Sequence, residues 1–185
     1  MLWWPIEIPI LTSGLVILRE VKAEDIEDIY QGAQDPLIPK FTTVPPNYSI
    51  DLAKNFVAKA PTSFANQTEL IFTIAISGKE NNEKFAGVIS LHTIDHGNHR
   101  AEIGYWLAKS ARGKGVGKTA VELLTEFGLL TIGFKRIEAM VNIENEASRK
   151  LLLSAGYEFE GVLRQRTTNH EGKQIDMADF AATKV

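Results

Sequence analysis

The stretch ARGKGVGKTA, residues 111 to 120, is rich in glycine and basic side chains and ends in Gly-Lys-Thr. Three kinds of phosphate-binding loop have this composition, and each belongs to a different fold. A Walker A loop needs a glycine five positions before Gly117, where Arg112 stands. A dinucleotide-binding fingerprint, G-x-G-x-x-A, fits residues 115–120. The third pattern, Arg/Gln-x-x-Gly-x-Gly, begins at Arg112 and opens a helix whose N-terminus binds a pyrophosphate.

The order of the elements predicted around this loop decides among the three. Strands are predicted at 14–21, 69–77, 85–95, 100–108, 135–143, 157–168 and 174–182, and helices at 23–34, about 49–59, from the loop to about 130, and 145–156. The proline-rich segment 35–47 is predicted to be a loop. Three strands joined by short turns precede the glycine-rich stretch, which favours antiparallel neighbours over repeated βαβ crossovers. The sequence therefore predicts an α+β fold with a mixed sheet, and the third pattern for the loop.

Length and composition limit the classes of protein. We expect a single domain over residues 1–185, with residues 1–13 as an extended N-terminal arm. A net charge of −3 gives no electrostatic case for nucleic acid as a partner. The chain has no cysteine, which excludes disulfides, thiolate catalysis and cysteine-based zinc sites, and makes the cytoplasm the expected compartment.

The apolar N-terminus, MLWWPIEIPIL, lacks the basic start of a signal peptide and is interrupted by Pro5 and Pro9. No apolar run reaches the roughly 18 residues of a membrane span, so no membrane partner is expected. Trp3 and Trp4 fit two interpretations. They either pack in an extended arm or line an acceptor groove or a homodimer contact.

Three histidines, His92, His96 and His99, lie within eight residues and raise the question of a metal. Because Asp95-His96-Gly97-Asn98 is a turn sequence between two strands, it should scatter the three rings. We predict a hairpin here and no metal site. Tyr157, which follows Gly156, is predicted to pack in the core.

Around the loop, three blocks carry a resemblance to a known family: AEIGYWLAKSARGKGVGKTAVELLTEF, then RIEAMVNIENEASRKLLLSAGYEFEGVLR, then DMADFA. From Gly14 onward the chain resembles the GNAT superfamily of acyl-CoA-dependent N-acetyltransferases. It is most similar to the RimJ/RimL branch, which acetylates protein N-termini, ribosomal proteins among them. The resemblance implies a mixed, mostly antiparallel sheet flanked by helices, with a splay between family strands four and five.

The resemblance also implies acetyl-CoA as co-substrate and no metal. The backbone of Tyr105, Trp106 and Leu107 would pair with the pantetheine amides like an added strand. The N–H groups of Arg112, Gly113, Lys114, Gly115, Val116, Gly117 and Lys118 would meet the pyrophosphate, with Lys114 and Lys118 adding positive charge. Asn145 would hydrogen-bond the cofactor amides.

Two residues are implied in catalysis. Glu102 would act as general base through a water, for an α-amine whose pKa is roughly 7.7–8.0; the alternative is a strand carboxylate facing solvent. Many GNAT enzymes protonate the leaving thiolate with a tyrosine, whose place here is taken by Leu152. RimL-like members have Asn-x-x-Ser instead, matched by Asn145 and Ser148. Ser148 is therefore the candidate acid; the alternative is a capping role, because Asn and Ser are common helix N-caps.

The predicted activity is transfer of an acetyl group to a primary amine by direct attack in a ternary complex, with a protein N-terminal α-amine as the expected acceptor. Two alternatives stay open: a small amine such as a polyamine or antibiotic, and a non-catalytic acyl-CoA-binding module. The intact motif residues argue against the second alternative. The identity of the acceptor is expected to depend on the loop between the first two helices and on the hairpin 164–174.

Overall fold

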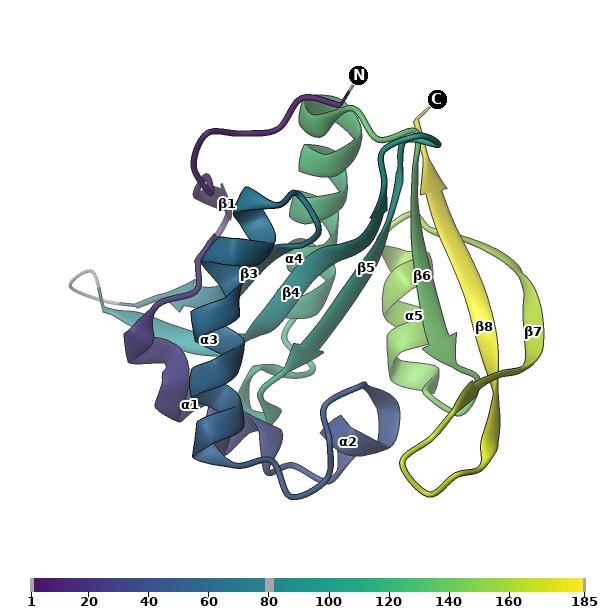
Figure 1. Cartoon of the computed structure of the whole chain (residues 1–185), viewed down its shortest axis with the longest axis horizontal. Coiled ribbons are helices and arrows are strands. Elements are labelled where there is room, and N and C mark those ends of the chain that lie inside the picture. The colour runs from purple at the N-terminus through teal and green to yellow at the C-terminus, as the bar shows by residue number, and fades with distance from the viewer. Residues whose placement is uncertain (1, 79–81, 185) are drawn as a thin grey trace.

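The fold, seen in a computed structural model that describes residues 2–78 and 82–184, is a twisted sheet with helices on both faces (Figure 1). The strands are β1 (Leu11–Ser13), β2 (Val16–Glu20), β3 (Leu70–Ser77), β4 (Glu83–Asp95), β5 (Arg100–Leu107), β6 (Arg136–Asn142), β7 (Glu158–Thr168) and β8 (Gln174–Thr183). The helices are α1 (Ile26–Ala33), α2 (Leu37–Phe41), α3 (Ile50–Ala65), α4 (Val116–Glu126) and α5 (Glu146–Ser154). Short 3-10 turns precede α1 and α4, and a π-helical segment, Phe127–Ile132, extends α4.

The eight strands form one sheet in the order β1-β2-β3-β4-β5-β6-β8-β7. Every neighbouring pair is antiparallel except β5 and β6, which are parallel. These two strands pair over only three residues each, Arg100–Glu102 with Arg136–Glu138. Beyond Glu102 they diverge, so the predicted α+β class, the mixed sheet and the splay are confirmed.

Two hydrophobic clusters hold the helices to opposite faces of the sheet. The larger cluster packs α4 and α5 against one face through residues such as Leu124, Leu152 and Phe134. The smaller cluster packs α1 and α3 against the other face, over β3 and β4. β3 is buried along most of its length because helices cover both of its faces, which is why its sequence is almost continuously apolar.

The segment 35–47, predicted to be a loop, contains the short helix α2. The Asp35 carboxylate accepts a hydrogen bond from Leu37 N–H at 2.9 Å and thereby supports the start of that helix. The helix predicted at about 49–59 begins as expected, with Ser49 Oγ accepting from Leu52 N–H. It continues to Ala65 with Pro61 inside it, so the expected end at Lys59 was wrong.

The remaining boundaries agree closely with the sequence. Gly156, with φ of 87°, follows the end of α5 as the predicted C-terminal glycine. The hairpin of β4 and β5 turns at residues 96–99. Part of the turn predicted between β3 and β4, residues 79–81, lies outside the described residues.

The N-terminal arm lies against the rest of the molecule. Its last residues form β1, which pairs with β2. Trp4 packs on Phe64 and donates its indole N–H to the Phe64 carbonyl at 3.1 Å. Trp3 is about half exposed. Among the described residues, no helix has the length and apolar character that crossing a membrane requires.

Candidate active site

The main chain of β5 faces the splay at alternate residues. Ala108 N–H donates to the Ala86 carbonyl on the β4 side at 2.8 Å. Since alternate residues of a strand direct their N–H and C=O to opposite sides, Trp106 faces β4, while Tyr105 and Leu107 face the splay. Of the three residues predicted to pair with pantetheine, the structure brings these two to the open edge.

Trp106 serves the packing of α1 instead. A Cβ atom at Gly32 would lie 2.6 Å from the Trp106 ring, so the helix approaches the indole closely only because residue 32 is glycine. The ring also packs against Phe85, with centroids 5.9 Å apart. Trp106 therefore positions α1 over the sheet, and its main chain is directed away from the splay.

The glycine-rich loop leads into the N-terminus of α4. Gly113 and Gly115 have φ of 70° and 78°, and a Cβ atom on either would meet nothing within 4 Å. These glycines provide the left-handed backbone of the turn and leave its outer surface open. The first helical hydrogen bond runs from Thr119 N–H to the Gly115 carbonyl. The N–H groups at the start of α4 therefore have no partner within the helix and are placed to receive an anion.

Gly117 has a different function from the other two loop glycines. A Cβ atom there would lie 2.7 Å from Leu151 and 2.8 Å from Leu107 side-chain carbons. Residue 117 thus faces the interior, where α4 meets α5 and the end of β5. Its role in the structure is close packing, and its N–H belongs to the open helix start.

The cations of the loop are partly committed to contacts within the protein. Arg112 donates Nε and Nη2 to the Leu107 carbonyl and pairs with Asp35 at 2.8 Å. Lys114 Nζ donates to the Ser110 carbonyl at 2.8 Å, and exposed Lys118 lies 3.4 Å from Glu122. The two lysines are free to rotate toward an anion, whereas the Arg112 guanidinium shapes the loop.

Ser148 lies in the first turn of α5, opposite β5. Asn145 is the N-cap of this helix, and its side-chain oxygen accepts from Ser148 N–H at 3.1 Å. The Ser148 hydroxyl lies 2.8 Å from the Tyr105 hydroxyl, so a hydrogen bond joins α5 to the diverging part of β5. The predicted motif Asn-x-x-Ser is therefore a cap and a positioned hydroxyl together.

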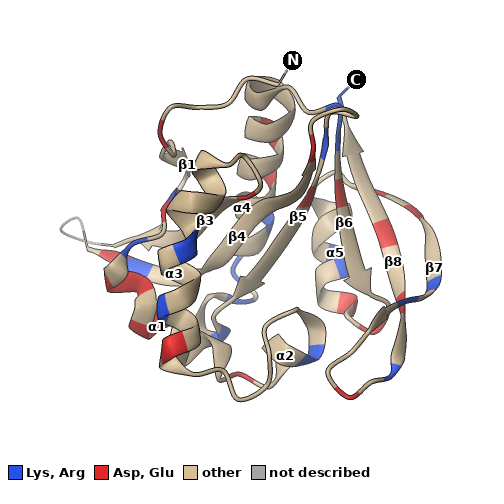
Figure 2. Cartoon of the chain, in the orientation of Figure 1, with Lys and Arg blue, Asp and Glu red and all other residues tan. Residues whose placement is uncertain are grey.

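Glu102 lies where β5 and β6 separate, on the face of the sheet opposite α4. Its neighbours Ala101 and Ile103 are buried against the α4 side, which directs Glu102 the other way. Burial raises the pKa of Glu102 to about 7, and the like charges of Glu138 and Asp179 add to this effect. Acidic positions on β5, β6 and β8 stand near one another in Figure 2. A carboxyl with this pKa exchanges protons near neutral pH.

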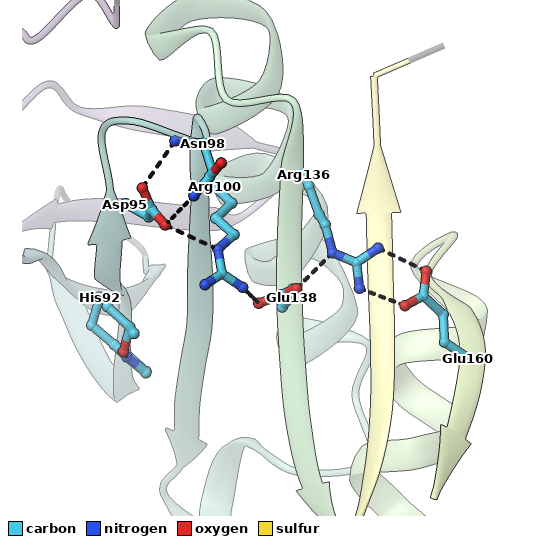
Figure 3. A network of polar contacts seen from close by, with 8 residues as sticks. His92, Asp95, Asn98, Arg100, Arg136, Glu138 and Glu160 are labelled. Atoms are coloured by element: carbon cyan, nitrogen blue, oxygen red, sulfur yellow. Dashed lines mark hydrogen bonds and ion pairs between the residues drawn. The ribbon is translucent and has the colours of Figure 1, made fainter. Parts of the chain in front are cut away.

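A row of alternating charges crosses the sheet where β5 and β6 are still paired (Figure 3). Asp95 contacts Arg100, and Arg100 contacts Glu138 at 3.3 Å. Glu138 also accepts from Arg136 at 2.7 Å, and Arg136 reaches Glu160 on β7. This row ties four strands together at the closed end of the splay.

The three histidines do not converge. His92 lies on β4 as the partner of Glu102, while residues 96 and 99 belong to the turn. The His92 ring covers Gly104, where a Cβ atom would lie 2.7 Å from Nε2. Burial lowers the pKa of His92, so this ring is neutral at pH 7. In the described part of the chain, no group of three His, Cys, Asp or Glu side chains is placed to hold a metal ion.

Comparison with known proteins identifies the class. The acetyltransferase (GNAT) domain family matches residues 16–158. An uncharacterized N-acetyltransferase, p20, of Bacillus licheniformis is 32% identical over 182 residues, covering 94% of this chain and 96% of that protein. The chain therefore belongs to the GNAT acetyltransferase family. It is an acyltransferase that uses acetyl-CoA as co-substrate, as the sequence predicted.

Two further relatives have named acceptors. The ribosomal-protein-serine acetyltransferase of Escherichia coli K12 is 32% identical over 83 residues, covering 45% of this chain and 46% of that protein. The spermidine N(1)-acetyltransferase of the same strain is 23% identical over 148 residues, covering 80% of this chain and 75% of that protein.

Solved structures share the fold. The microcin C7 self-immunity acetyltransferase MccE, in complex with acetyl-CoA and AMP, superposes with a TM-score of 0.81 at 26% identity, over 93% of this chain and 94% of that one. RimJ of Mycobacterium smegmatis, in complex with CoA-disulfide, superposes with a TM-score of 0.84 at 24% identity, over 97% of this chain and 88% of that one. These structures show the shared fold, and the ribosomal-protein relative supports the RimJ/RimL-like branch.

Two residues of this region escaped sequence reasoning. Asp35 lies in a segment predicted to be a loop, and nothing in the sequence indicates that it meets Arg112. For Tyr105 the sequence predicts a role of the main chain only, because the family resemblance concerns the main chain of this strand. The alternation of β5 could have placed the Tyr105 side chain on the same face as buried Ile103.

Proposed function

We propose that this enzyme acetylates the N-terminal α-amine of a protein or peptide, with Glu102 as general base. The observation that carries the proposal is the position of the largely buried Glu102 carboxyl where β5 and β6 separate, an environment that raises its pKa to about 7. An α-amine has a pKa of roughly 7.7–8.0, within about one unit of this carboxyl. A lysine-type or polyamine nitrogen, at about 10.4, would be more than three units away. Glu102 is thus matched to the more acidic amine.

The arrangement around β5 supports a direct attack. Glu102 points to one face of the strand, while Tyr105 points to the other face, where Ser148 meets it. A thioester held by the main chain of Tyr105 and Leu107 would lie between the two faces. Glu102 removes the amine proton through a water as the C–N bond forms. The C–S bond then breaks, and its electron pair goes to the sulfur, toward which the Ser148 hydroxyl donates.

The remaining predicted residues would hold the co-substrate. The open N–H groups from Gly113 to Lys118 would receive the pyrophosphate, with the lysine ammonium groups nearby. Arg112 contributes by fixing the loop. The Asn145 side-chain amide nitrogen is available to a pantetheine carbonyl, since its oxygen is used in the cap.

Exposed carboxylates would favour the alternative acceptor, a polyamine. In the acidic segment at 23–35, Glu24, Glu27 and Asp28 are exposed, whereas the other two carboxylates are occupied within the protein. Asp25 is buried and accepts hydrogen bonds from Arg19, Lys22 N–H and Thr73. Asp35 is paired with Arg112. Two of the carboxylates that could attract a polycation are therefore already neutralised, although the spermidine relative keeps this acceptor worth testing.

The deciding experiment measures thiol release from acetyl-CoA with a panel of acceptors. Peptides with free N-termini are paired with identical peptides whose α-amine is blocked, and spermidine and an aminoglycoside are included. We expect turnover with free N-termini and none with the blocked partners. Turnover with blocked peptides that contain lysine, or with spermidine alone, would contradict the α-amine proposal.

The cytoplasmic location, a homodimer and a single domain over 1–185 stay predictions.

A further inference from the structure

The hydroxyl groups of Tyr105 and Ser148 meet across the place where the sheet opens. Tyr105 lies on β5 beyond the last residue that pairs with β6, and Ser148 lies in the first turn of α5. Their oxygens are 2.8 Å apart, although the residues are 43 positions apart in the chain. Both side chains are partly buried, so the bond is shielded from competing water.

The chemistry of the two groups indicates which one donates. Each hydroxyl has one proton, and a phenol is a better donor than an aliphatic alcohol. Burial raises the pKa of Tyr105 to about 12, so its proton stays on the oxygen at neutral pH. With Tyr105 as donor, the Ser148 oxygen accepts, and the Ser148 proton is left to point elsewhere.

We propose that Tyr105 is a positioning residue, which fixes the Ser148 hydroxyl so that its proton faces the splay and the departing sulfur. The inference rests on the proposed role of Ser148 and adds a second residue to it. The resulting chain runs from Tyr105 O–H to Ser148 Oγ, and from Ser148 O–H to the sulfur. Hydrogen bonds in such a chain strengthen one another. The Ser148 hydroxyl is thus oriented before the co-substrate binds.

Tyr105 is not itself the acid. A thiol of the cysteine type has a pKa of about 8.5, so a proton passed from Tyr105 to the thiolate would move uphill by more than three units. Both hydroxyls therefore keep their protons when the C–S bond breaks, so Ser148 donates a hydrogen bond to the sulfur and is not the acid that the resemblance implies. The sulfur leaves as a thiolate stabilised by Ser148, the amine proton goes to Glu102, and solvent protonates the thiolate after release.

The test is a double-mutant cycle on turnover with a peptide acceptor. Ser148→Ala should lower kcat by about 10- to 100-fold, as expected for loss of a hydrogen bond to a developing charge. Tyr105→Phe removes only the phenol oxygen and should lower kcat by about 3- to 10-fold, the scale of one neutral hydrogen bond. KM for acetyl-CoA should change little in either variant. The double variant should match Ser148→Ala alone, because Tyr105 acts only through the serine.

The chain offers a matched control. Tyr157 is buried, and its hydroxyl bonds to Thr125 Oγ1 at 2.7 Å and not to Ser148. Tyr157→Phe removes an equivalent buried hydroxyl and should leave kcat near the wild-type value. Wild-type turnover of Tyr105→Phe, or multiplying losses in the double variant, would overturn the inference while leaving Ser148 in its role. Wild-type turnover of Ser148→Ala would remove the proposed role of the serine itself.

Discussion

Arg112 Nη1 lies 2.8 Å from Asp35 Oδ2, and this ion pair joins the glycine-rich loop to helix α2. The same guanidinium donates twice to the Leu107 carbonyl, at the end of β5. Asp35 in turn supports the first turn of α2. At the other end of α2, Lys40 lies 3.6 Å from Glu144, just before the cap of α5. Helix α2 is thus connected to both the glycine-rich loop and the helix that carries Ser148.

The first prediction concerns this pair. Asp35→Asn keeps an acceptor for Leu37 N–H but removes the charge that faces Arg112. We expect the free energy of unfolding to fall by about 1 kcal/mol and KM for acetyl-CoA to rise, because the loop loses its tether to α2. Denaturant titration and steady-state kinetics measure the two effects. An unchanged KM would show that the pair is structural only.

The same variant should alter the response to acid. The Leu37 N–H, and then the Arg112 charge, lower the pKa of Asp35. A lowered folded-state pKa stabilises the fold above the unfolded-state value, and this stability is lost as the pH falls through the folded-state value. The stability difference between wild type and Asp35→Asn should therefore shrink in strong acid. A difference that is constant from pH 7 to pH 2 would contradict this assignment.

The second prediction is that Glu102→Gln loses the base. At pH 7 we expect kcat/KM on a peptide acceptor to fall by about 10²- to 10⁴-fold, with acetyl-CoA affinity unchanged. Wild-type kcat/KM should rise through pH 7, following the pKa of Glu102. The deficit of the variant should diminish at higher pH, where more of the amine is already neutral. Wild-type activity of the variant at neutral pH would make Glu102 a structural carboxylate.

The raised pKa of Glu102 should also lower the free energy of unfolding near neutral pH, and this effect can be measured separately from activity. Its folded-state pKa, about 7, is above the ordinary value of 4.5, so the folded protein holds a proton that the unfolded chain releases between these values. Wild-type stability should therefore fall as the pH rises from about 4.5 through 7. Glu102→Gln removes this dependence and should gain about 1–2 kcal/mol on wild type between pH 5 and pH 8, after allowance for solvent screening. Parallel stability profiles of the two proteins would contradict the raised pKa.

The third prediction tests the neighbouring carboxylate. Glu138 is the partner of Glu102 across the parallel pair and raises its pKa. Glu138→Gln should move the acidic limb of the pH–rate profile to lower pH and raise relative activity at pH 6 by about two-fold. Glu160→Gln is the matched control, since it also removes a partner of Arg136 but lies on β7. Equal shifts in both variants would mean that the ion-pair row, and not the charge beside Glu102, is responsible.

The fourth prediction concerns the loop glycines. Gly115 faces open space with φ of 78°, a conformation that Asp and Asn both tolerate. Gly115→Asp and Gly115→Asn have the same shape and differ in charge. We expect acetyl-CoA to bind about 10- to 100-fold more weakly to the aspartate variant than to the asparagine variant, because the added charge repels the pyrophosphate. Equal affinities of the two variants, measured by calorimetry, would show that the phosphates do not bind at this loop. Gly117 is a poor site for the same test, since a side chain there would disturb Leu107 and Leu151.

The boundaries that the sequence missed share one cause. Helix α2 depends on the Asp35 carboxylate, whose orientation depends on Arg112, far along the chain. The end of α3 lies beyond Pro61, where local preference predicts an earlier stop. Packing of this helix against the sheet, in the cluster that includes Ala53 and Ala60, outweighs the local signal. Neither effect is visible in a window of neighbouring residues.

The sequence by itself determined the order of the longer strands and helices, the α+β class, the glycine-rich helix start and the cap at Asn145, because each depends on residues close together in the chain. Only the tertiary structure decided which of these residues contact one another and which of them are buried. It brings the Tyr105 and Ser148 hydroxyls together, commits Arg112 to Asp35, and turns the main chain of Trp106 toward β4. It also buries Glu102 beside Glu138 and thereby raises its pKa. Hydrogen bonds, ion pairs and desolvation depend on distance in space, and that distance is set only when β5, β6, α2 and α5 pack together.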